Sequence, residues 1–364
     1  MTTQELQKIV SNFAIEGEVA DIKPLGAGFI NDTMTVHTKG SAPDYILQRK
    51  NKQIFPDVPA MMANIVAVTE HIRKKVVEAG GDPLREVLTV VFTHDGKPYY
   101  IHEGEYWTMC LYIEGSVTYM RADTPALAYK GGEGIGKFHS QLADFTTPLA
   151  ETIKGFHNIR FRFEQWDAVI ARDAVGRCKD LTEEIGWIES RRKDMLDFWS
   201  LVENGEIPMR VTHNDTKISN FLFDDKGEVL CVIDLDTVMS STTLNDFGDA
   251  IRTFGNTGEE DDRNLDNVSL SMEMFRAYTE GYMAQRKATM SPSEVEWLAF
   301  GARYIVFEQV LRFLMDYIDG DTYYRIASPD HNLVRTRAQY ALLTSIEEHY
   351  DEMCAIVKEL GATA

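Results

Sequence analysis

Residues 211–220 of the chain read Val211-Thr212-His213-Asn214-Asp215-Thr216-Lys217-Ile218-Ser219-Asn220. This run fits the pattern H-x-D-x-K-x-x-N, whose polar side chains suit the movement of a phosphoryl group. Asp215 can orient a hydroxyl nucleophile and accept its proton, and Lys217 can offset charge on the transferring group. The amide oxygen of Asn220 can face a magnesium ion. We therefore predict that this loop performs phosphoryl transfer, with Asp215 and Lys217 as catalytic residues.

A second polar cluster ends an apolar stretch at residues 229–236, which read Val229-Leu230-Cys231-Val232-Ile233-Asp234-Leu235-Asp236. A buried carboxylate is costly unless it is paired or binds a metal, so Asp234 is the natural magnesium ligand. Asp236 faces the same side if the strand continues, which makes it a second candidate for contact with metal or substrate. Asp234 lies 19 residues after Asp215, about the separation between base and metal ligand in a protein-kinase-like catalytic hairpin.

The string Asp246-Phe247-Gly248 spells the metal-binding motif of protein kinases, but its context is wrong. It lies 31 residues after Asp215, and no apolar strand leads into it. We therefore interpret Asp246 and Asp249 as structural residues that hold the catalytic loop or cap the following helix. The alternative is a purely structural role for the two polar clusters, as a helix cap and a strand end. Their order and spacing favour the functional interpretation.

Strands dominate the first third of the chain and helices the remainder. Alternating apolar residues predict strands at 34–38, 45–49, 87–92, 99–102 and 106–113. Apolar residues spaced three or four apart predict helices at 1–20 and 57–79. Helical spacing follows at 123–145, 160–177, 180–204, 268–286, 292–319 and 340–360, with short strands at 221–223 and 230–235. We predict an α+β, protein-kinase-like fold with two lobes. Residues 1–112 form a small strand-rich, nucleotide-binding N-lobe, and residues 113–364 form a larger helical C-lobe with the catalytic loop and the acceptor site.

The composition narrows the classes of partner. The formal net charge is -20, whereas a nucleic-acid binder or a protein of anionic membrane surfaces needs a basic footprint. The four cysteines lie far apart without a CxxC pair, so we expect free thiols in a reducing compartment. The N-terminus has no signal-peptide pattern, and no apolar stretch approaches the length of a membrane span. We expect a cytoplasmic protein that acts on small molecules.

Seven stretches of the chain carry a resemblance to a known family. They are 45–48, 54–57, 210–217, 233–237, 246–249, 275–281 and 331–337. In these stretches the chain resembles the aminoglycoside phosphotransferase and choline kinase superfamily, and within it the bacterial N-acetylhexosamine 1-kinases. The resemblance implies ATP and Mg²⁺, with the anomeric hydroxyl of N-acetylglucosamine or N-acetylgalactosamine as acceptor. It implies Asp215 as base, Asn220 and Asp234 as metal ligands, and Arg312 and Tyr323 as residues of the sugar pocket.

The loop at residues 26–31 is expected on the nucleotide side of the site. Gly26 and Gly28 suit a close approach of the backbone to phosphates, although a plain hairpin turn explains these glycines about as well. Asn31 is predicted to contact the acceptor. Relatives place a sugar-contacting His in this loop, where this chain has Phe29, so the sugar contact would be lost or replaced by stacking. Further nucleotide contacts are expected from the backbone of the linking strand, at Tyr112 and Ile113.

The strand at 45–49 departs from the protein-kinase pattern. If Ile46 lies against adenine, alternation puts Gln48 where protein kinases carry the Lys that binds the α and β phosphates. Gln offers a hydrogen bond but no charge. Lys217, the metal, Arg49 or Lys50 must therefore supply the charge.

Arg312 and the identity of the acceptor leave alternatives. Arg312 lies in a strongly apolar helix, so it must extend to the surface, pair with a carboxylate such as Glu308, or face a polar cleft. Another small acceptor, such as homoserine, choline, methylthioribose or an aminoglycoside, is the alternative substrate. The non-enzyme alternative is a pseudokinase-like binding module, which the missing strand Lys favours and the intact catalytic residues oppose.

Overall fold

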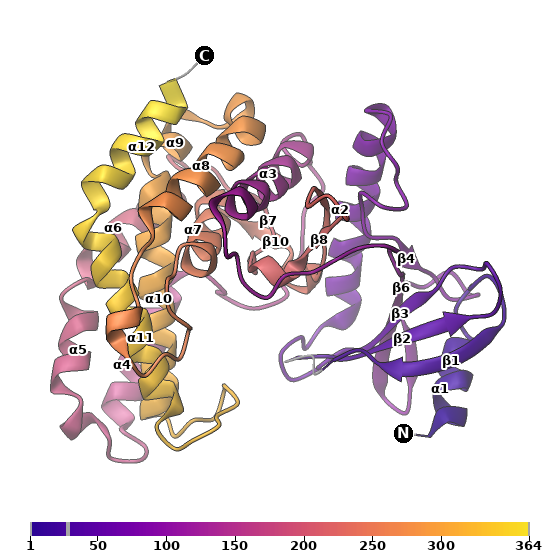
Figure 1. Cartoon of the computed structure of the whole chain (residues 1–364). Coiled ribbons are helices and arrows are strands. Elements are labelled where there is room, and N and C mark those ends of the chain that lie inside the picture. Colours follow the sequence, from indigo (N-terminus) through magenta and orange to yellow (C-terminus); the bar gives the residue numbers. More distant parts are fainter. Residues whose placement is uncertain (1, 27–29, 363–364) are drawn as a thin grey trace. The chain divides into compact units, whose positions relative to one another are not determined.

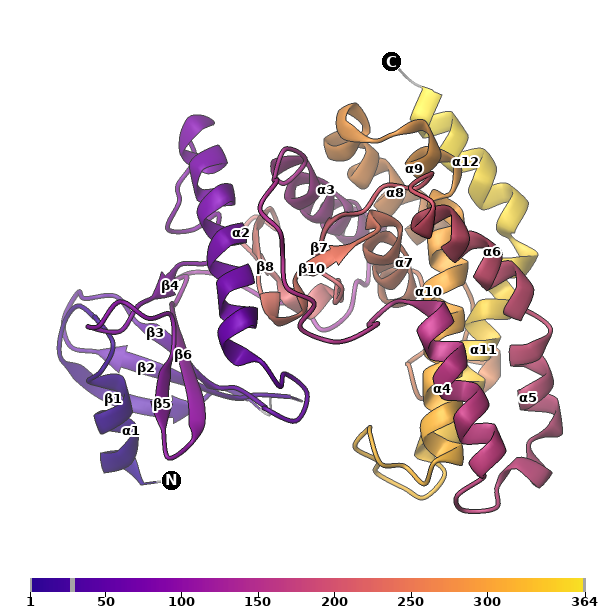
Figure 2. The same cartoon turned by 180° about the vertical axis from the view of Figure 1, so that it is seen from behind.

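The computed structural model describes residues 2–26 and 30–362, and the chain forms two compact units (Figure 1, and from behind in Figure 2). Unit 1 comprises residues 1–118, 144–154 and 221–239, and unit 2 comprises residues 119–143, 155–220 and 240–364. Unit 1 holds an antiparallel sheet and unit 2 is mainly helical, so the predicted α+β class is confirmed. The units differ from the predicted lobes at 1–112 and 113–364, because unit 1 extends to Thr118 and includes two later segments.

An antiparallel sheet forms the body of unit 1. Its strands are β1 (Val19–Pro24), β2 (Asp32–Thr38), β3 (Tyr45–Arg49), β4 (Val90–Val91), β5 (Tyr100–His102) and β6 (Glu105–Leu111). They run in the order β1-β2-β3-β6-β4, and β5 pairs with β6. Leu47 of β3 lies opposite Met34 of β2 and Met109 of β6. The sheet and α1 (Thr3–Val10) share a core of Ile9, Val10, Phe13, Val36, Tyr45, Leu47, Trp107 and Met109.

A long helix and a short hairpin complete unit 1. The helix is α2 (Val58–Glu78), and the hairpin pairs β8 (Phe221–Phe223) with β9 (Val229–Val232). Asp57 caps α2 by accepting the backbone N–H of Ala60. Asn64 of α2, which is buried, donates to the carbonyl oxygens of Ala150 at 2.8 Å and Val238 at 3.0 Å. These bonds fix the segment that follows β9, which carries two of the predicted site residues.

Unit 2 is built around the buried helix α10. Its helices are α3 (Pro125–Gln141), α4 (Ile159–Arg172), α5 (Thr182–Glu189), α6 (Arg192–Glu203), α7 (Thr243–Phe254), α8 (Met272–Arg286), α9 (Pro292–Glu296), α10 (Leu298–Ile318), α11 (His331–Glu348) and α12 (Tyr350–Ala362). Two short strands, β7 (Arg210–Thr212) and β10 (Met239–Ser241), pair with each other. Most residues of α10 are buried, and α11 runs beside it (Figure 1). Among the described residues, none of the helices is both long and apolar enough to cross a bilayer.

Glycines allow α3 and α8 to approach closely. A Cβ atom on Gly132 of α3 would lie 2.1 Å from the carbonyl oxygen of Tyr278 and 2.7 Å from the backbone nitrogen of Tyr282. A Cβ atom on Gly281 of α8 would lie 2.0 Å from the carbonyl oxygen of Tyr129. The obstacles are backbone atoms of the facing helix, so no side-chain rearrangement can relieve them. The two helices must move apart if either glycine gains a side chain.

We expect Gly132→Ala to lower the free energy of unfolding by about 1–3 kcal/mol, because overpacking displaces one helix from the other. Gly186→Ala is the matched control. Gly186 lies inside α5, with nothing within 4 Å of its added Cβ, so the same change there should stabilise by about 0.5–1 kcal/mol. Urea titration of both variants measures the difference. Equal stability of the two variants would contradict the tight packing of α3 on α8.

Candidate active site

The predicted catalytic loop lies in unit 2 and ends in the short turn η2 (Ile218–Asn220). Asn214 adopts a φ of +64°, a left-handed conformation that costs energy in a residue other than glycine. The carboxylate of Asp246 holds this bend by accepting the backbone N–H groups of His213 and Asn214, each at 2.7 Å. The loop conformation is therefore imposed from outside the loop.

Asp246 is a fully buried residue in the first turn of α7. Its Oδ2 atom lies 2.8 Å from Nε2 of His139. Burial raises the pKa of Asp246, but the contacts with His139 and His213 lower it by more than burial raises it. The net pKa therefore lies below its usual value. Thr242 is the residue that caps α7. The structural interpretation of Asp246 is thus confirmed, as a residue that holds the catalytic loop and does not cap the helix.

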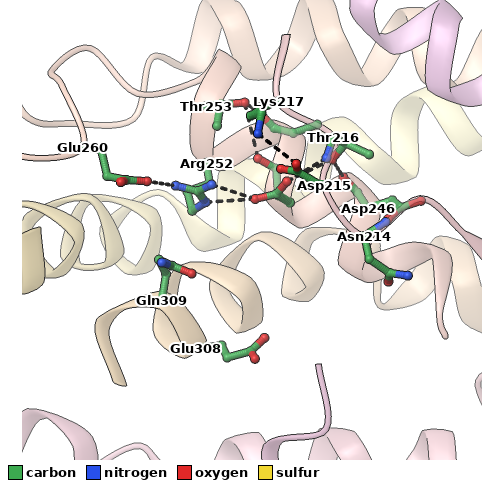
Figure 3. A network of polar contacts seen from close by, with 12 residues as sticks. Asn214, Asp215, Thr216, Lys217, Asp246, Arg252, Thr253, Glu260, Glu308 and Gln309 are labelled. Atoms are coloured by element: carbon green, nitrogen blue, oxygen red, sulfur yellow. Dashed lines mark hydrogen bonds and ion pairs between the residues drawn. The ribbon is translucent and has the colours of Figure 1, made fainter. Parts of the chain in front are cut away.

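A second carboxylate of α7 fixes the residue between Asp215 and Lys217. Asp249 accepts the backbone N–H of Thr216 at 2.8 Å. Arg252 donates to Glu260 at 2.7 Å (Figure 3) and to Asp249 at 3.0 Å, so Asp249 is itself held in place. The loop is therefore positioned by two aspartates of one helix.

Asp215 forms a compact polar group with Lys217 and Asn220. Lys217 Nζ lies 2.9 Å from Asp215 Oδ2 (Figure 3), and Asn220 Nδ2 donates to the same oxygen at 3.0 Å. Burial raises the pKa of Asp215, but Lys217, His213 and Asn220 lower it to a net value below that of an ordinary aspartate. The structure therefore brings three predicted site residues together around an ionised carboxylate.

Asp234 and Asp236 lie in unit 1, directly after β9. Asp234 has a φ of +61°, and the chain turns there into η3 (Leu235–Thr237) instead of continuing as a strand. Asp236 is only 5% exposed, and Lys50 Nζ lies 2.7 Å and 2.8 Å from its two oxygens. Asn31 Nδ2 also donates to Asp236, at 2.8 Å. Asp236 is thus the ion-pair partner of Lys50, and a role in metal binding stays a prediction.

Lys50 is one of the sources of positive charge that the sequence left open, and the structure shows its surroundings. It follows β3 and shares its face with Ile46 and Gln48, since residues two apart point the same way. Its side chain is 3% exposed and also donates to Gln48 Oε1 at 2.7 Å. Gln48 in turn donates to Thr33 Oγ1 at 3.2 Å. A buried cation thus lies beside the position where protein kinases carry theirs, and Gln48 helps to orient it.

The remaining predicted site residues of unit 1 lie in the loop at 26–31, in β3 and directly after β6. Gly26 has a φ of +63°, which suits glycine, whereas Gly28 and Phe29 lie outside the described residues. Asn31, predicted as an acceptor contact, is 8% exposed and bonds through Oδ1 to the N–H of Asn51 at 3.1 Å. Both ends of its amide are therefore used within unit 1. Ile46 and Tyr112 are half-buried and Ile113 is buried, and their contacts with adenine stay predictions.

The predicted acceptor side is a polar cluster inside unit 2. His157 Nδ1 lies 2.7 Å from Glu308, and its Nε2 lies 3.5 Å from the carbonyl oxygen of Asn214 in the catalytic loop. Arg162 Nε donates to the other oxygen of Glu308 at 3.2 Å. Burial raises the pKa of Glu308, but His157 and the two arginines, Arg162 and Arg312, bring it down to about 2.

Arg312 itself is surrounded by aromatic rings. Its guanidinium carbon lies 5.4 Å from the ring centroid of Phe156, 5.9 Å from that of Tyr323 and 5.6 Å from that of Tyr324. It donates to Gln309 Oε1 at 3.4 Å, and in the described part of the chain it forms no ion pair. Figure 3 shows Glu308 and Gln309, its neighbours on α10, in one view with the catalytic loop. Of the proposed environments, the direct ion pair with Glu308 is absent in these residues.

Known proteins share both sequence features and fold with this chain. The profile of the phosphotransferase enzyme family matches residues 21–281, which include both polar clusters. A spectinomycin phosphotransferase in complex with ADP and spectinomycin is 12% identical with a TM-score of 0.59, covering 99% of this chain and 98% of that one. An aminoglycoside phosphotransferase from Alicyclobacillus acidocaldarius is 12% identical with a TM-score of 0.59, covering 95% and 96%. A choline kinase from Streptococcus pneumoniae is 13% identical with a TM-score of 0.51, covering 90% and 94%. At these identities the solved structures establish the kinase-like fold.

Proposed function

This chain belongs to the phosphotransferase enzyme family, and on that premise we propose that it is an ATP-dependent kinase for a small metabolite. The proposed acceptor is the anomeric hydroxyl of N-acetylglucosamine or N-acetylgalactosamine, and the product is the sugar 1-phosphate. The observation that carries the reaction type is the polar group of Asp215, Lys217 and Asn220. It combines an ionised carboxylate, a cation and an amide in the loop where such enzymes orient and deprotonate a hydroxyl.

Asp215 acts as the base in the proposed mechanism. Its carboxylate accepts the proton of the acceptor hydroxyl while that oxygen attacks the γ-phosphorus, and the bond to the β–γ bridging oxygen breaks to release ADP. An anomeric hydroxyl is more acidic than an ordinary alcohol, so a weakly basic carboxylate with a lowered pKa suffices. Lys217 lies 2.9 Å from Asp215 and is placed to offset charge on the transferring group.

The nucleotide side requires positive charge, because the net charge of -20 opposes the binding of an anion. Asp234 and Asn220 offer carboxylate and amide oxygens, which are the donors that Mg²⁺ prefers. When bound, the ion would neutralise charge on the phosphates. We assign the protein's own charge for the phosphates to Lys50, with Asp236 as the counter-ion that balances it when no nucleotide is bound.

The positive charge of Arg312, beside the polar cluster of His157, Arg162 and Glu308, favours a neutral acceptor over a cationic one. Glu308 pairs with Arg162, whereas Arg312 forms no ion pair in the described part of the chain, so choline or an aminoglycoside would meet a positive charge there. The carbonyl oxygen of an acetamido group can instead accept a hydrogen bond from the Arg312 guanidinium. Tyr323, 56% exposed, offers a flat ring against which a sugar can pack.

We expect Arg312→Ala to raise the KM for the sugar by about 10–100-fold, since a hydrogen bond from a charged group is lost. The KM for ATP should stay unchanged. Arg263→Ala is the matched control, because Arg263 is an exposed arginine paired with Asp330. Steady-state kinetics with the sugar and ATP varied in turn make the measurement. A variant that loses its far-UV circular dichroism would instead assign Arg312 to the stability of unit 2.

The reaction itself is tested by ³¹P NMR after incubation of the protein with MgATP and each N-acetylhexosamine. The expected result is a new phosphomonoester signal that couples to the anomeric proton. ATP consumption with phosphate at another hydroxyl would overturn the anomeric assignment. Intact ATP with both sugars would overturn the N-acetylhexosamine assignment, and a panel of homoserine, choline, methylthioribose and an aminoglycoside would then identify the acceptor.

A further inference from the structure

The loop at residues 320–326, here named the acceptor loop, connects α10 to α11 and carries Tyr323 and Tyr324. It begins with two residues in left-handed conformations, Gly320 with a φ of +92° and Asp321 with a φ of +60°. Tyr323 is more than half exposed, so its own packing cannot hold the loop in one conformation. Contacts to the loop backbone must therefore decide where Tyr323 lies.

One carboxylate supplies those contacts. Asp316, on the last turn of α10, is 5% exposed. Its Oδ1 atom accepts the backbone N–H groups of Thr322 at 2.9 Å and Tyr323 at 2.8 Å, and its Oδ2 atom accepts that of Tyr324 at 3.0 Å. Three consecutive peptide groups of the loop thus converge on one side chain. Such a charge-assisted set of bonds defines a backbone conformation closely.

A buried amide fixes Asp316 in turn. Asn332 of α11 is fully buried and donates from Nδ2 to Asp316 Oδ2 at 2.8 Å and to Asp321 Oδ1 at 2.9 Å. The other oxygen of Asp321 lies 2.7 Å from Arg177. The start of the loop and its anchor are therefore joined through one side chain of the next helix.

The conformation of the acceptor loop decides what surrounds Arg312. Both loop tyrosines lie near its guanidinium, with ring centroids at 5.9 Å and 5.6 Å. The hydroxyl group of Tyr324 accepts a hydrogen bond from Gln309 Nε2 at 3.4 Å, and its ring packs on Phe313 at 4.8 Å between centroids. Tyr323 is more exposed and contacts the ring of Tyr324 at 4.8 Å between centroids, so its distance from Arg312 depends on the backbone that Asp316 holds.

We propose that Asp316 is a positioning residue for acceptor specificity, which fixes the acceptor loop so that Tyr323 and Arg312 form one wall of the sugar site. The proposal rests on the proposed function. Asp316 does not touch the acceptor and acts through the backbone N–H groups of the loop. Asp246 and Asp249 of α7 hold the catalytic loop in the same way, by accepting its backbone N–H groups.

The test replaces Asp316 with Asn, which keeps the shape but turns one acceptor oxygen into a donor. In place of Oδ1 that donor faces the N–H groups of Thr322 and Tyr323, and in place of Oδ2 it faces the N–H of Tyr324 and the amide of Asn332. We expect hydrogen exchange of the amides of residues 322–324 to become at least about tenfold faster in the free protein. The KM for the sugar should rise by about tenfold with an unchanged KM for ATP, and the preference for N-acetylglucosamine over glucose in kcat/KM should fall by about tenfold.

Asp319→Asn is the matched control, because Asp319 follows α10 directly, three residues after Asp316, and among the described residues it pairs with Arg172 at the surface. It should change neither the exchange rates of residues 322–324 nor the kinetics.

If Asp316→Asn does not fold, Asn332→Ala serves in its place. It removes one bond to Asp316 and leaves the three backbone bonds, so the same effects on exchange and kinetics are expected, but smaller. Faster exchange with unchanged sugar KM and preference would overturn the proposal, as would unchanged exchange. Because exchange is measured without acceptor, a wild-type protein that phosphorylates no N-acetylhexosamine overturns the proposed function separately from this result.

Discussion

Replacing Asp215 with Asn is expected to lower kcat for phosphate transfer by about 10²–10⁴-fold, the usual contribution of a general base. The amide cannot accept the proton of the attacking hydroxyl. It can still accept the hydrogen bond from Asn220, so the shape of the loop is retained. The measurement is the rate of ADP release with saturating sugar and MgATP. Asp225→Asn provides the control, because Asp225 is an exposed carboxylate in the hairpin of unit 1 and its replacement should leave kcat unchanged.

The pH dependence of transfer gives a second readout for Asp215. The pKa of Asp215 is lowered in the folded protein by Lys217, His213 and Asn220, so the acidic decline of transfer by the wild type should lie at a lower pH than the pKa of an ordinary aspartate predicts. The same sign applies to stability: the ion pair with Lys217 contributes above the unfolded pKa and is lost as the pH falls through the folded one. In Asp215→Asn the acidic decline of kcat should disappear. A variant that transfers phosphate at the wild-type rate would remove Asp215 from the mechanism.

The catalytic loop could be predicted because its chemistry is local in sequence. Asp215, Lys217 and Asn220 fall within six residues, so any compact loop brings them close to one another. The supports of the loop were predicted less completely. The position of Asp246 excluded a metal role, but the sequence does not show that His139, which is 107 residues away, contacts the same carboxylate.

Several boundaries were wrong because tertiary contacts decide them. The predicted helix at 180–204 is broken into α5 and α6, where Arg191 bonds to Glu347 of α11, 156 residues away. The predicted helix at 292–319 is likewise broken between α9 and α10 at Trp297. The predicted helix at 1–20 ends at Val10, and Val19–Pro24 instead forms β1 by pairing with β2. Apolar periodicity continues across such breaks, so the pattern alone does not reveal them.

Lys50 illustrates the same limit at the proposed site. The sequence leaves Lys50 as one of several sources of charge, because alternation along the strand puts Gln48 at the position of the protein-kinase Lys. The partner that distinguishes Lys50 from its neighbours is Asp236, 186 residues further along the chain. Arg49, the adjacent cation, points to the other face and pairs with Asp32 at the surface. The choice between the two cations therefore required the fold.

Lys50→Met is expected to lower both nucleotide affinity and stability. Removing one partner of a buried ion pair leaves the other charge uncompensated, which costs about 3–5 kcal/mol of the free energy of unfolding. Asn31 still donates to Asp236, which places the expected loss at the lower end of that range. If Lys50 binds the phosphates, the dissociation constant for MgADP should also rise by at least about tenfold. Urea titration and calorimetry with MgADP make the two measurements without any acceptor.

A double variant separates the two effects. In Lys50→Met with Asp236→Leu both charges are replaced by apolar groups, so most of the lost stability should return. The affinity for MgADP should not return, because the cation is still missing. Arg49→Met, which removes a charge one residue away at the surface, should change neither quantity. Native affinity for MgADP in Lys50→Met would make the ion pair purely structural and would leave Lys217 and the metal as the charges for the phosphates. Affinity that returns with stability in the double variant would mean that Lys50 acts only by supporting the fold of unit 1.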